Sequence, residues 1–237
     1  MIYPDHKKWA DIIFKPYLYR LFKHHFYSMI LLDEQPVVKE KVPLLLLPNH
    51  SSWWDGFFIY LLNRKFFHRR PYLMMLEEQL SQNRFFRHVG AYSIDSASSA
   101  EMKKSLRFTL DLFQPKDAGR LICIFPQGEL QAWHKRPIEF RRGIEFLLKR
   151  IPLPVQILLL GIRIEFLNEQ YPQVFFQFSP LQLVDAFGTF SVEHLALSMQ
   201  DLLEDLQHRI IEQEKGNVIF CGRRSVNERM QIFSGKG

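Results

Sequence analysis

The chain has 237 residues, of which 47% are hydrophobic and 24% charged, a composition that is ordinary for one globular domain and unlike that of a disordered chain. Its net charge of +6 suits an anionic membrane surface or a nucleic acid. The basic residues are interleaved with acidic and apolar ones and form no known nucleic-acid-binding motif, so we expect no nucleic-acid partner. Two cysteines make no disulfide framework, and no cluster of histidine, cysteine and carboxylate residues has metal-ligand spacing, so we expect no metal site.

Residues 1–35 combine aromatic and cationic side chains. They contain no run of 18 apolar residues and predict no membrane-spanning helix. From Ile12 to Leu32, apolar residues are mixed with Lys15, Arg20 and Lys23, as in helices that lie in a membrane interface. We therefore expect residues 1–35 to form one or two amphipathic membrane-docking helices, and residues 36–237 to form the main domain. A helix packed on the core of that domain is the alternative.

A polar stretch follows the four leucines at 44–47. The apolar run, closed by Pro48 and Asn49, predicts a buried strand that ends in a turn, and the two serines that follow predict a helix start. This pattern places His50 at the open end of a sheet, five residues before Asp55. If the chain curls back, Asp55 accepts a hydrogen bond from Nδ1 of His50, and Nε2 is left to take a proton from a hydroxyl. A histidine that is only a turn residue is the alternative.

The middle of the chain alternates helix and strand signals. Residues 71–86 predict a helix and residues 89–94 a short strand. Ser98 and Glu101 have the spacing of a capping box, which opens the next predicted helix. Helices and strands are therefore expected to alternate through this region.

A second buried strand is predicted from Leu121 onward. It ends at the segment Phe125-Pro126-Gln127-Gly128-Glu129, where a turn again places polar groups at the point where a sheet would open.

The C-terminal part predicts strands at 155–167 and 173–178 and a long amphipathic helix at 191–214, whereas residues 217–237 give no clear prediction. Together with the earlier elements, this alternation predicts an α/β fold. We expect a layered, mostly parallel sheet flanked by helices, preceded by the membrane-interfacial helices of the N-terminus.

The two polar turns together resemble the glycerolipid (lysophospholipid) acyltransferase superfamily, which includes the 1-acylglycerol-3-phosphate acyltransferases. The first block of that family is NHxxxxD, as at residues 49–55, and its third is FPEG, as at residues 125–128 with one change. Residues 140–143 and 151–155 resemble two further segments, so the resemblance spans roughly residues 42–160. It implies that His50 and Asp55 are catalytic. The substrate-binding residues that it implies are Asn49, Phe125, Pro126, Gln127, Gly128 and Glu129. For Gln127 and Glu129 a purely structural role is the alternative.

The departures from the family pattern concern the acceptor. Gln127 stands where the family usually has Glu, and Glu129 and Leu130 stand where Thr and Arg are usual. Ser96 stands where the second block has an Arg that holds a phosphate-bearing acceptor, and arginine is the residue best suited to bidentate phosphate binding. We therefore expect the acceptor to be a hydroxyl of a lipid without phosphate, such as a glycolipid or a glycosylated terpenoid. A 1-acylglycerol-3-phosphate acyltransferase of phospholipid synthesis is the alternative.

The resemblance implies an acyltransferase that moves a fatty acyl group from acyl-CoA or acyl-ACP, as donor substrate rather than cofactor, to a hydroxyl of a membrane lipid. We expect His50 to act as general base, and backbone N–H groups at the Gln127–Gly128 turn or at the helix start after His50 to hold the oxyanion. The resemblance also favours peripheral or monotopic attachment to the cytoplasmic face of a membrane. A catalytically inactive lipid-binding protein remains as an alternative, a hydrolase is disfavoured because no G-x-S-x-G elbow is present, and the oligomeric state stays open.

Overall fold

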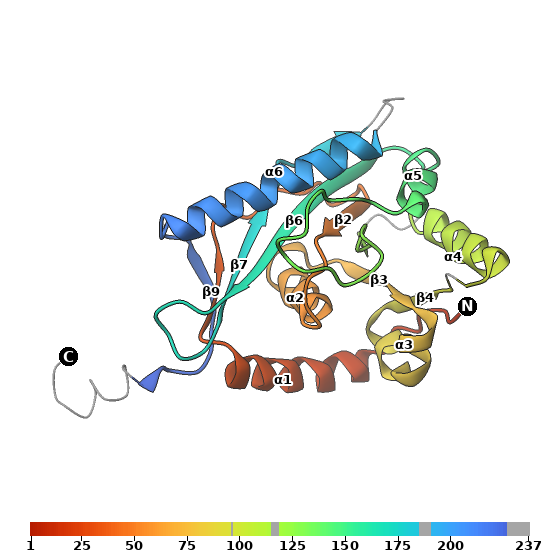
Figure 1. The fold of residues 1–237 in the computed structure, drawn as a ribbon. Coiled ribbons are helices and arrows are strands. Elements are labelled where there is room, and N and C mark those ends of the chain that lie inside the picture. The colour runs from red at the N-terminus through yellow and green to blue at the C-terminus, as the bar shows by residue number, and fades with distance from the viewer. Residues whose placement is uncertain (96, 115–118, 185–190, 227–237) are drawn as a thin grey trace.

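One sheet forms the centre of the computed structural model, which describes residues 1–95, 97–114, 119–184 and 191–226. Within these residues the sheet has nine strands in the order β4-β3-β5-β2-β6-β7-β1-β9, with β8 paired to β6 (Figure 1). Parallel pairing joins β2 to β5 and β6, β3 to β4 and β5, and β1 to β7, and the other pairs are antiparallel. The predicted α/β fold with a mostly parallel sheet is confirmed. The strands are β1 (Ser28–Leu31), β2 (Leu44–Pro48), β3 (Arg70–Leu76), β4 (Ala91–Ile94), β5 (Arg120–Cys123), β6 (Val155–Glu165), β7 (Gln173–Phe178), β8 (Gln182–Val184) and β9 (Asn217–Cys221).

Helices cover both faces of this sheet. Figure 1 shows α4, α5 and α6 on one side and α1 and α2 on the other. Each side has its own hydrophobic cluster, so strands in the middle of the sheet are buried on both faces and mostly apolar. The helices are α1 (Lys8–His25), α2 (Asp55–Leu62), α3 (Glu77–Gln82), α4 (Ser99–Asp111), α5 (Arg142–Leu148) and α6 (Val192–Ile211), with a π-helix η1 (Asn63–Phe67) and a 3₁₀-helix η2 (Arg84–Val89).

Strand β2 is the inner strand that positions the site. Its leucines alternate between the two clusters, with Leu45 and Leu47 on the side of α6 and Leu44 and Leu46 on the side of α1 and α2, because successive side chains of a strand point to opposite faces. Strands β5 and β6 flank β2 in parallel. The carboxyl ends of β2 and β5 therefore lie together at one edge of the sheet, and the two polar turns that follow them are neighbours.

Several predicted elements are confirmed. Ser98 is the N-cap of α4, where its hydroxyl accepts a hydrogen bond from the Glu101 N–H at 3.3 Å. Strands β6 and β7 and helix α6 lie where the apolar patterns placed them. Residues 217–221, which gave no prediction, form the edge strand β9 beside β1.

The predicted helix at residues 71–86 is wrong in its first half. Residues 70–76 form β3, which lies between β4 and β5, and the helix α3 begins only at Glu77. The segment contains Leu and Met, which favour helices in isolation, but parallel pairing on both sides outweighs that local preference.

The N-terminal region also differs from the prediction. A single helix, α1, ends at His25, and residues 28–31 form β1 between β7 and β9 instead of a second helix. The boundary expected at residue 35 thus follows a strand that is part of the central sheet. None of the described helices has the length and apolar character needed to cross a membrane. The packed inner face of α1 (Ala10, Phe14, Leu18 and Phe22) shows that this helix also covers the core.

Gly90 is a position where the fold requires glycine. It has a φ of 109° between η2 and β4, and a Cβ there would lie 2.2 Å from the carbonyl oxygen of Pro71 at the start of β3. Gly119 also has a positive φ, of 134°, but a Cβ there would meet no atom of the described residues within 4 Å. The two glycines therefore separate the cost of backbone conformation from the cost of a clash.

We predict that Gly90→Ala lowers the free energy of unfolding by clearly more than Gly119→Ala. Both variants force an alanine into a conformation that costs roughly 1–2 kcal/mol, but only Gly90→Ala must also push β3 away from β4. Urea denaturation of both variants and the wild type measures the difference. An equal loss of unfolding free energy in the two variants would show that β3 and β4 can move apart at Gly90 without an energetic cost.

Candidate active site

His50 and Asp55 meet at the carboxyl edge of the sheet. His50 follows the end of β2, Asp55 is the first residue of α2, and Nδ1 of His50 lies 2.9 Å from Oδ2 of Asp55. A carboxylate can only accept, so Nδ1 carries the hydrogen, and the neutral ring keeps its lone pair on Nε2. The histidine side chain is 23% exposed, whereas Asp55 is fully buried. The predicted contact between the two side chains is present.

The buried carboxylate of Asp55 is held by more than the histidine. Oδ2 also accepts hydrogen bonds from the N–H groups of Ser51 at 2.8 Å and Ser52 at 2.9 Å, and Oδ1 accepts one from the Ser52 hydroxyl. The Ser52 oxygen in turn accepts the Trp54 N–H at 3.2 Å. A charge removed from water is tolerated when several donors satisfy it, so this set of bonds keeps the loop from His50 to Asp55 curled back on itself.

Cys123 lies at the end of β5, close to the charge of Asp55. Burial raises the pKa of its thiol well above the usual range, and the Asp55 carboxylate adds to that rise. The reactive form of cysteine is the thiolate, so this side chain is unsuited to act as a nucleophile beside His50.

The second polar turn packs directly against the histidine. The ring of Phe125 stacks on the imidazole, with centroids 4.0 Å apart and planes at 21°. The Gln127 side chain accepts the His50 N–H at 2.6 Å through Oε1 and donates to Oε1 of Gln131 at 2.9 Å. The Gln131 N–H also donates to the His50 carbonyl at 2.9 Å. Gln127 and Gln131 therefore fix the backbone on both sides of the imidazole.

Gly128 and Glu129 are tied to Arg141, which precedes α5. Gly128 has a φ of 71°, and a Cβ there would lie 2.7 Å from Cγ of Arg141. Arg141 donates from Nε to the Gln127 carbonyl at 3.1 Å, and its Nη2 pairs with Oε2 of Glu129 at 2.9 Å. The N–H of Arg141 donates to the carbonyl of the buried Pro126 at 2.8 Å. A hydrogen bond from Gln131, followed by the charge of Arg141, lowers the pKa of the exposed Glu129 carboxyl, which therefore carries a negative charge.

Asn49, which precedes the histidine, is buried and anchors β2 to β6. Its Oδ1 accepts the Ile162 N–H at 2.7 Å, and its Nδ2 donates to the Ile162 carbonyl at 3.1 Å. Both ends of the amide therefore bind the backbone of β6, and in this structure the side chain acts as a support for His50.

Three of the expected oxyanion donors already have partners. The Gly128 N–H donates to the Phe125 carbonyl at 3.0 Å, and the N–H groups of Ser51 and Ser52 bind Asp55. An oxyanion held by any of these three groups would have to replace that partner, and a role for the Gln127 N–H stays a prediction.

Sequence reasoning missed Gln131, Arg141 and the Ser52 hydroxyl as parts of the site. The spacing of Ser52 and Asp55 is that of a capping box and carried a signal for their contact. Arg141 lies in the segment 140–143 that resembles the family, but that resemblance gave it no partner, and no local pattern marks Gln131. The partners of both residues are set by the folding of the loop after β5. Ser96, where the family has its phosphate-binding arginine, lies outside the described residues.

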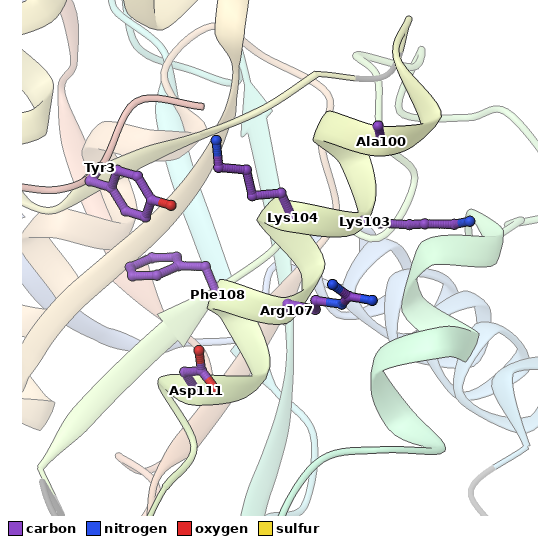
Figure 2. A pocket seen from close by; sticks show the side chains of 7 residues that line it. All are labelled: Tyr3, Ala100, Lys103, Lys104, Arg107, Phe108 and Asp111. Carbon is purple, nitrogen blue, oxygen red and sulfur yellow. The ribbon is translucent and has the colours of Figure 1, made fainter.

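Two hollows open on the described part of the molecule. The first, here called the Trp54 pocket, has a volume of about 370 Å³ and lies between the end of α1, Trp54 at the start of α2, and the β6–β7 loop. The second, the α4 pocket, has a volume of about 480 Å³ and is lined by α4 and Tyr3 (Figure 2). Figure 2 shows Lys104 pointing to the side of Tyr3, and Lys103 and Arg107 pointing to the other side of the helix. No group of three metal-ligating side chains occurs in the described part of the chain.

Comparisons with known proteins agree with this arrangement. A family model described as Acyltransferase matches residues 30–160, more than half of the chain. The crystal structure of PlsC, the 1-acyl-sn-glycerophosphate (LPA) acyltransferase from Thermotoga maritima, has a similar fold: the TM-score is 0.56 and the identity 16%, over 84% of this chain and 78% of that one. A search of curated proteins found no match. The family match covers both polar turns with the strands that carry them, and the chain is therefore an enzyme of the acyltransferase family.

Proposed function

We propose that this acyltransferase moves a fatty acyl group from a thioester donor, acyl-CoA or acyl-ACP, to a hydroxyl of a membrane lipid, with His50 as general base. The observation that carries the proposal is the contact between His50 and the buried Asp55. It holds the imidazole in the tautomer whose Nε2 can accept a proton.

The step follows from this geometry. As Nε2 of His50 takes the proton of the acceptor hydroxyl, the oxygen attacks the thioester carbonyl and forms a new C–O bond. The C–S bond then breaks, and the proton passes from the imidazolium to the leaving thiolate. Asp55 favours the transient positive charge on the ring, as a buried carboxylate does in a catalytic triad. The nucleophile comes from the substrate, so no serine or cysteine of the chain is needed.

We further propose that the acceptor lacks a phosphate, as in a glycolipid or a glycosylated terpenoid. The arginine closest to the second turn, Arg141, is engaged with Glu129 and with the Gln127 carbonyl. A phosphate would have to displace Glu129 from this pair. The family is equally compatible with 1-acylglycerol-3-phosphate acyltransfer, and the charge of +6 suits an anionic substrate, so lysophosphatidic acid is the competing acceptor in every assay.

The outer face of α1 supports attachment to a membrane. Opposite its packed face, Trp9, Ile12, Ile13 and Tyr17 are exposed, and Lys15 and Arg20 accompany them. Exposed aromatic and aliphatic side chains beside cations are the composition of a helix that lies in a membrane interface. We propose peripheral or monotopic attachment through this face, on the cytoplasmic side.

Replacing His50 tests the chemistry. We predict that His50→Ala lowers kcat by about 10²–10⁴-fold, because general-base catalysis contributes a factor of that size. The variant should stay folded, because the two backbone N–H groups and the Ser52 hydroxyl still bind Asp55. Transfer from radiolabelled palmitoyl-CoA to a panel of lipid acceptors measures the effect, and His194→Ala, an exposed histidine on α6, is the matched control. A fully active His50→Ala variant would remove the imidazole from the reaction, and a wild type that binds lipid without transfer would favour the inactive lipid-binding alternative.

Gln127 tests how the histidine is positioned. We predict that Gln127→Leu, which cannot accept the His50 N–H, costs about 1–3 kcal/mol of stability through an unpaired buried donor and lowers kcat more than it changes KM. Gln127→Glu keeps the acceptor oxygen and should restore most of the activity. Rescue by Glu distinguishes positioning from mere packing. If Leu and Glu lower kcat equally, the hydrogen bond to His50 has no part in catalysis.

A pair of exposed isoleucines tests the membrane face. Ile12 on α1 is 71% exposed and Ile211 on α6 is 64% exposed. We predict that Ile12→Asp weakens binding to vesicles of mixed phosphatidylcholine and phosphatidylglycerol several-fold. The change removes the apolar side chain that would be buried in the lipid, and it adds repulsion between the new carboxylate and the anionic lipid. Ile211→Asp makes the same change away from α1 and should leave binding unaltered. Equal sedimentation of both variants with vesicles would exclude α1 as the docking face.

A further inference from the structure

The α4 pocket combines a row of cations with an exposed aromatic ring. Residues three and four apart lie on the same face of a helix, so the outward face of α4 forms one continuous wall of the pocket. This wall carries three cations, Lys103, Lys104 and Arg107, and one carboxylate, Asp111, while Tyr3 stands opposite (Figure 2). The lining therefore has an excess of positive charge beside a ring.

The cations of this wall are available to a ligand. Lys103 and Arg107 are exposed, and neither pairs with a carboxylate among the described residues. Nζ of Lys104 lies 3.7 Å from Oε2 of Glu101, but that oxygen also binds the terminal ammonium group of Met1 at 2.9 Å. The positive charge of the wall is thus not cancelled locally, and it favours an anionic ligand.

The ring of Tyr3 is held in place although it is 46% exposed. Phe108 packs against it edge-on, with centroids 5.3 Å apart. The preceding residue, Ile2, is bound to β4: its N–H donates to Oγ of Ser93 at 2.6 Å, and its carbonyl accepts the Ser93 N–H at 3.0 Å. A fixed, partly exposed aromatic ring is suited to stacking on a nucleobase, since every base has a flat π-face.

The sheet places this pocket near the edge that carries His50. Strands β4, β3, β5 and β2 are successive parallel neighbours, so their carboxyl ends lie at the same edge. Helix α4 follows β4 and begins at Ser99, at this edge. Three strand spacings of about 4.8 Å separate β4 from β2, so the first turn of α4 is offset from His50 by roughly 14 Å along the edge.

Helix α5 connects α4 to the site. Figure 1 shows the two helices side by side, and a Cβ on Gly143 would lie 3.8 Å from the Leu106 side chain of α4. Helix α5 directly follows Arg141, which donates to the Gln127 carbonyl at 3.1 Å, and Gln127 in turn accepts the His50 N–H. The start of α5 therefore bridges the α4 pocket and the imidazole through contacts of the structure.

Coenzyme A has the charge, the ring and the length that this arrangement requires. One end is an adenosine with a 3′-phosphate and a diphosphate, and the other end carries the thioester. The pantetheine arm between them has a backbone about as long as four extended residues, which span roughly 14 Å. An acyl carrier protein has the same arm but no adenine, so it would use the cations of α4 and leave Tyr3 without a stacking partner.

We propose that the α4 pocket binds the nucleotide end of coenzyme A. The adenine stacks on Tyr3, the two lysines and the arginine of the wall bind the phosphates, and the pantetheine arm passes the start of α5 to bring the thioester to His50. This inference rests on the proposed function, because it identifies the donor of the same reaction as acyl-CoA instead of acyl-ACP.

Direct binding tests the cations without turnover. In calorimetric titration of the full chain with coenzyme A, Lys103→Gln/Arg107→Gln should weaken binding about tenfold or more, because it removes charge-assisted hydrogen bonds to phosphate. The control Lys65→Gln/Arg84→Gln removes the same two charges from exposed positions of η1 and η2 and should leave the affinity unaltered. Because the two double variants have the same net charge, a difference between them reports a local contact.

Tyr3 tests the nucleotide itself. Tyr3→Ala should weaken coenzyme A and adenosine 3′,5′-bisphosphate several-fold and by the same factor, and Tyr3→Phe should restore both. Pantetheine lacks the nucleotide, so its binding should be equal in all these proteins. In turnover, Tyr3→Ala and the α4 double variant should raise KM for palmitoyl-CoA and leave KM for the lipid acceptor unchanged.

Several results would overturn the proposal. They are coenzyme A binding that Tyr3→Ala and the α4 double variant leave intact, an equal loss of affinity in the control variant, and a KM for palmitoyl-ACP that rises in the α4 double variant while Tyr3→Ala leaves KM for palmitoyl-CoA unchanged. The last result would make the face of α4 a docking surface for a carrier protein. Because binding is read without chemistry, a failed pocket leaves the result for His50→Ala standing, and nucleotide binding by a protein that transfers no acyl group would reject the proposed function and keep the pocket.

Discussion

The carboxylate of Asp55 is the group on which the site depends. A fully buried charge is costly unless several donors satisfy it, and here the His50 ring, two backbone N–H groups and the Ser52 hydroxyl all bind it within six residues of chain. These bonds form only if the segment after β2 curls into the first turn of α2. The direction of the imidazole is therefore a consequence of satisfying one buried charge.

The sheet provides the contacts that hold His50 from outside its own loop. Strand β2 lies between β5 and β6. The loop after β5 therefore lies on one side of His50, and the backbone of β6 lies on the other. Gln127 binds the histidine backbone from the first side, and Asn49 binds Ile162 on the second. Both neighbours are parallel to β2, and their ends therefore open at the same edge. The site lies beyond the carboxyl ends of β2 and β5, where α/β sheets commonly bind ligands.

The residues that were predictable from sequence are those with a local signal. The spacing of His50 and Asp55, the Pro and Gly turn at 126–128, and the capping box at Ser98 each specify geometry within a few residues. Strands β1 and β3 were missed because their partners are distant in the chain and their composition also suits helices. The role of Gln127 was open for a related reason: its side chain can face the substrate or the His50 backbone, and only the packed loop decides between them.

Helix α1 has an inner and an outer face with different surroundings. Its inner face packs Phe14, Leu18 and Phe22 into the core, its outer face exposes the residues proposed to enter the membrane interface, and its last turn contacts Trp54, which directly precedes Asp55. Since α1 is fixed to the core by its inner face, the proposed membrane contact would also fix the orientation of the sheet edge that carries His50 relative to the lipid surface.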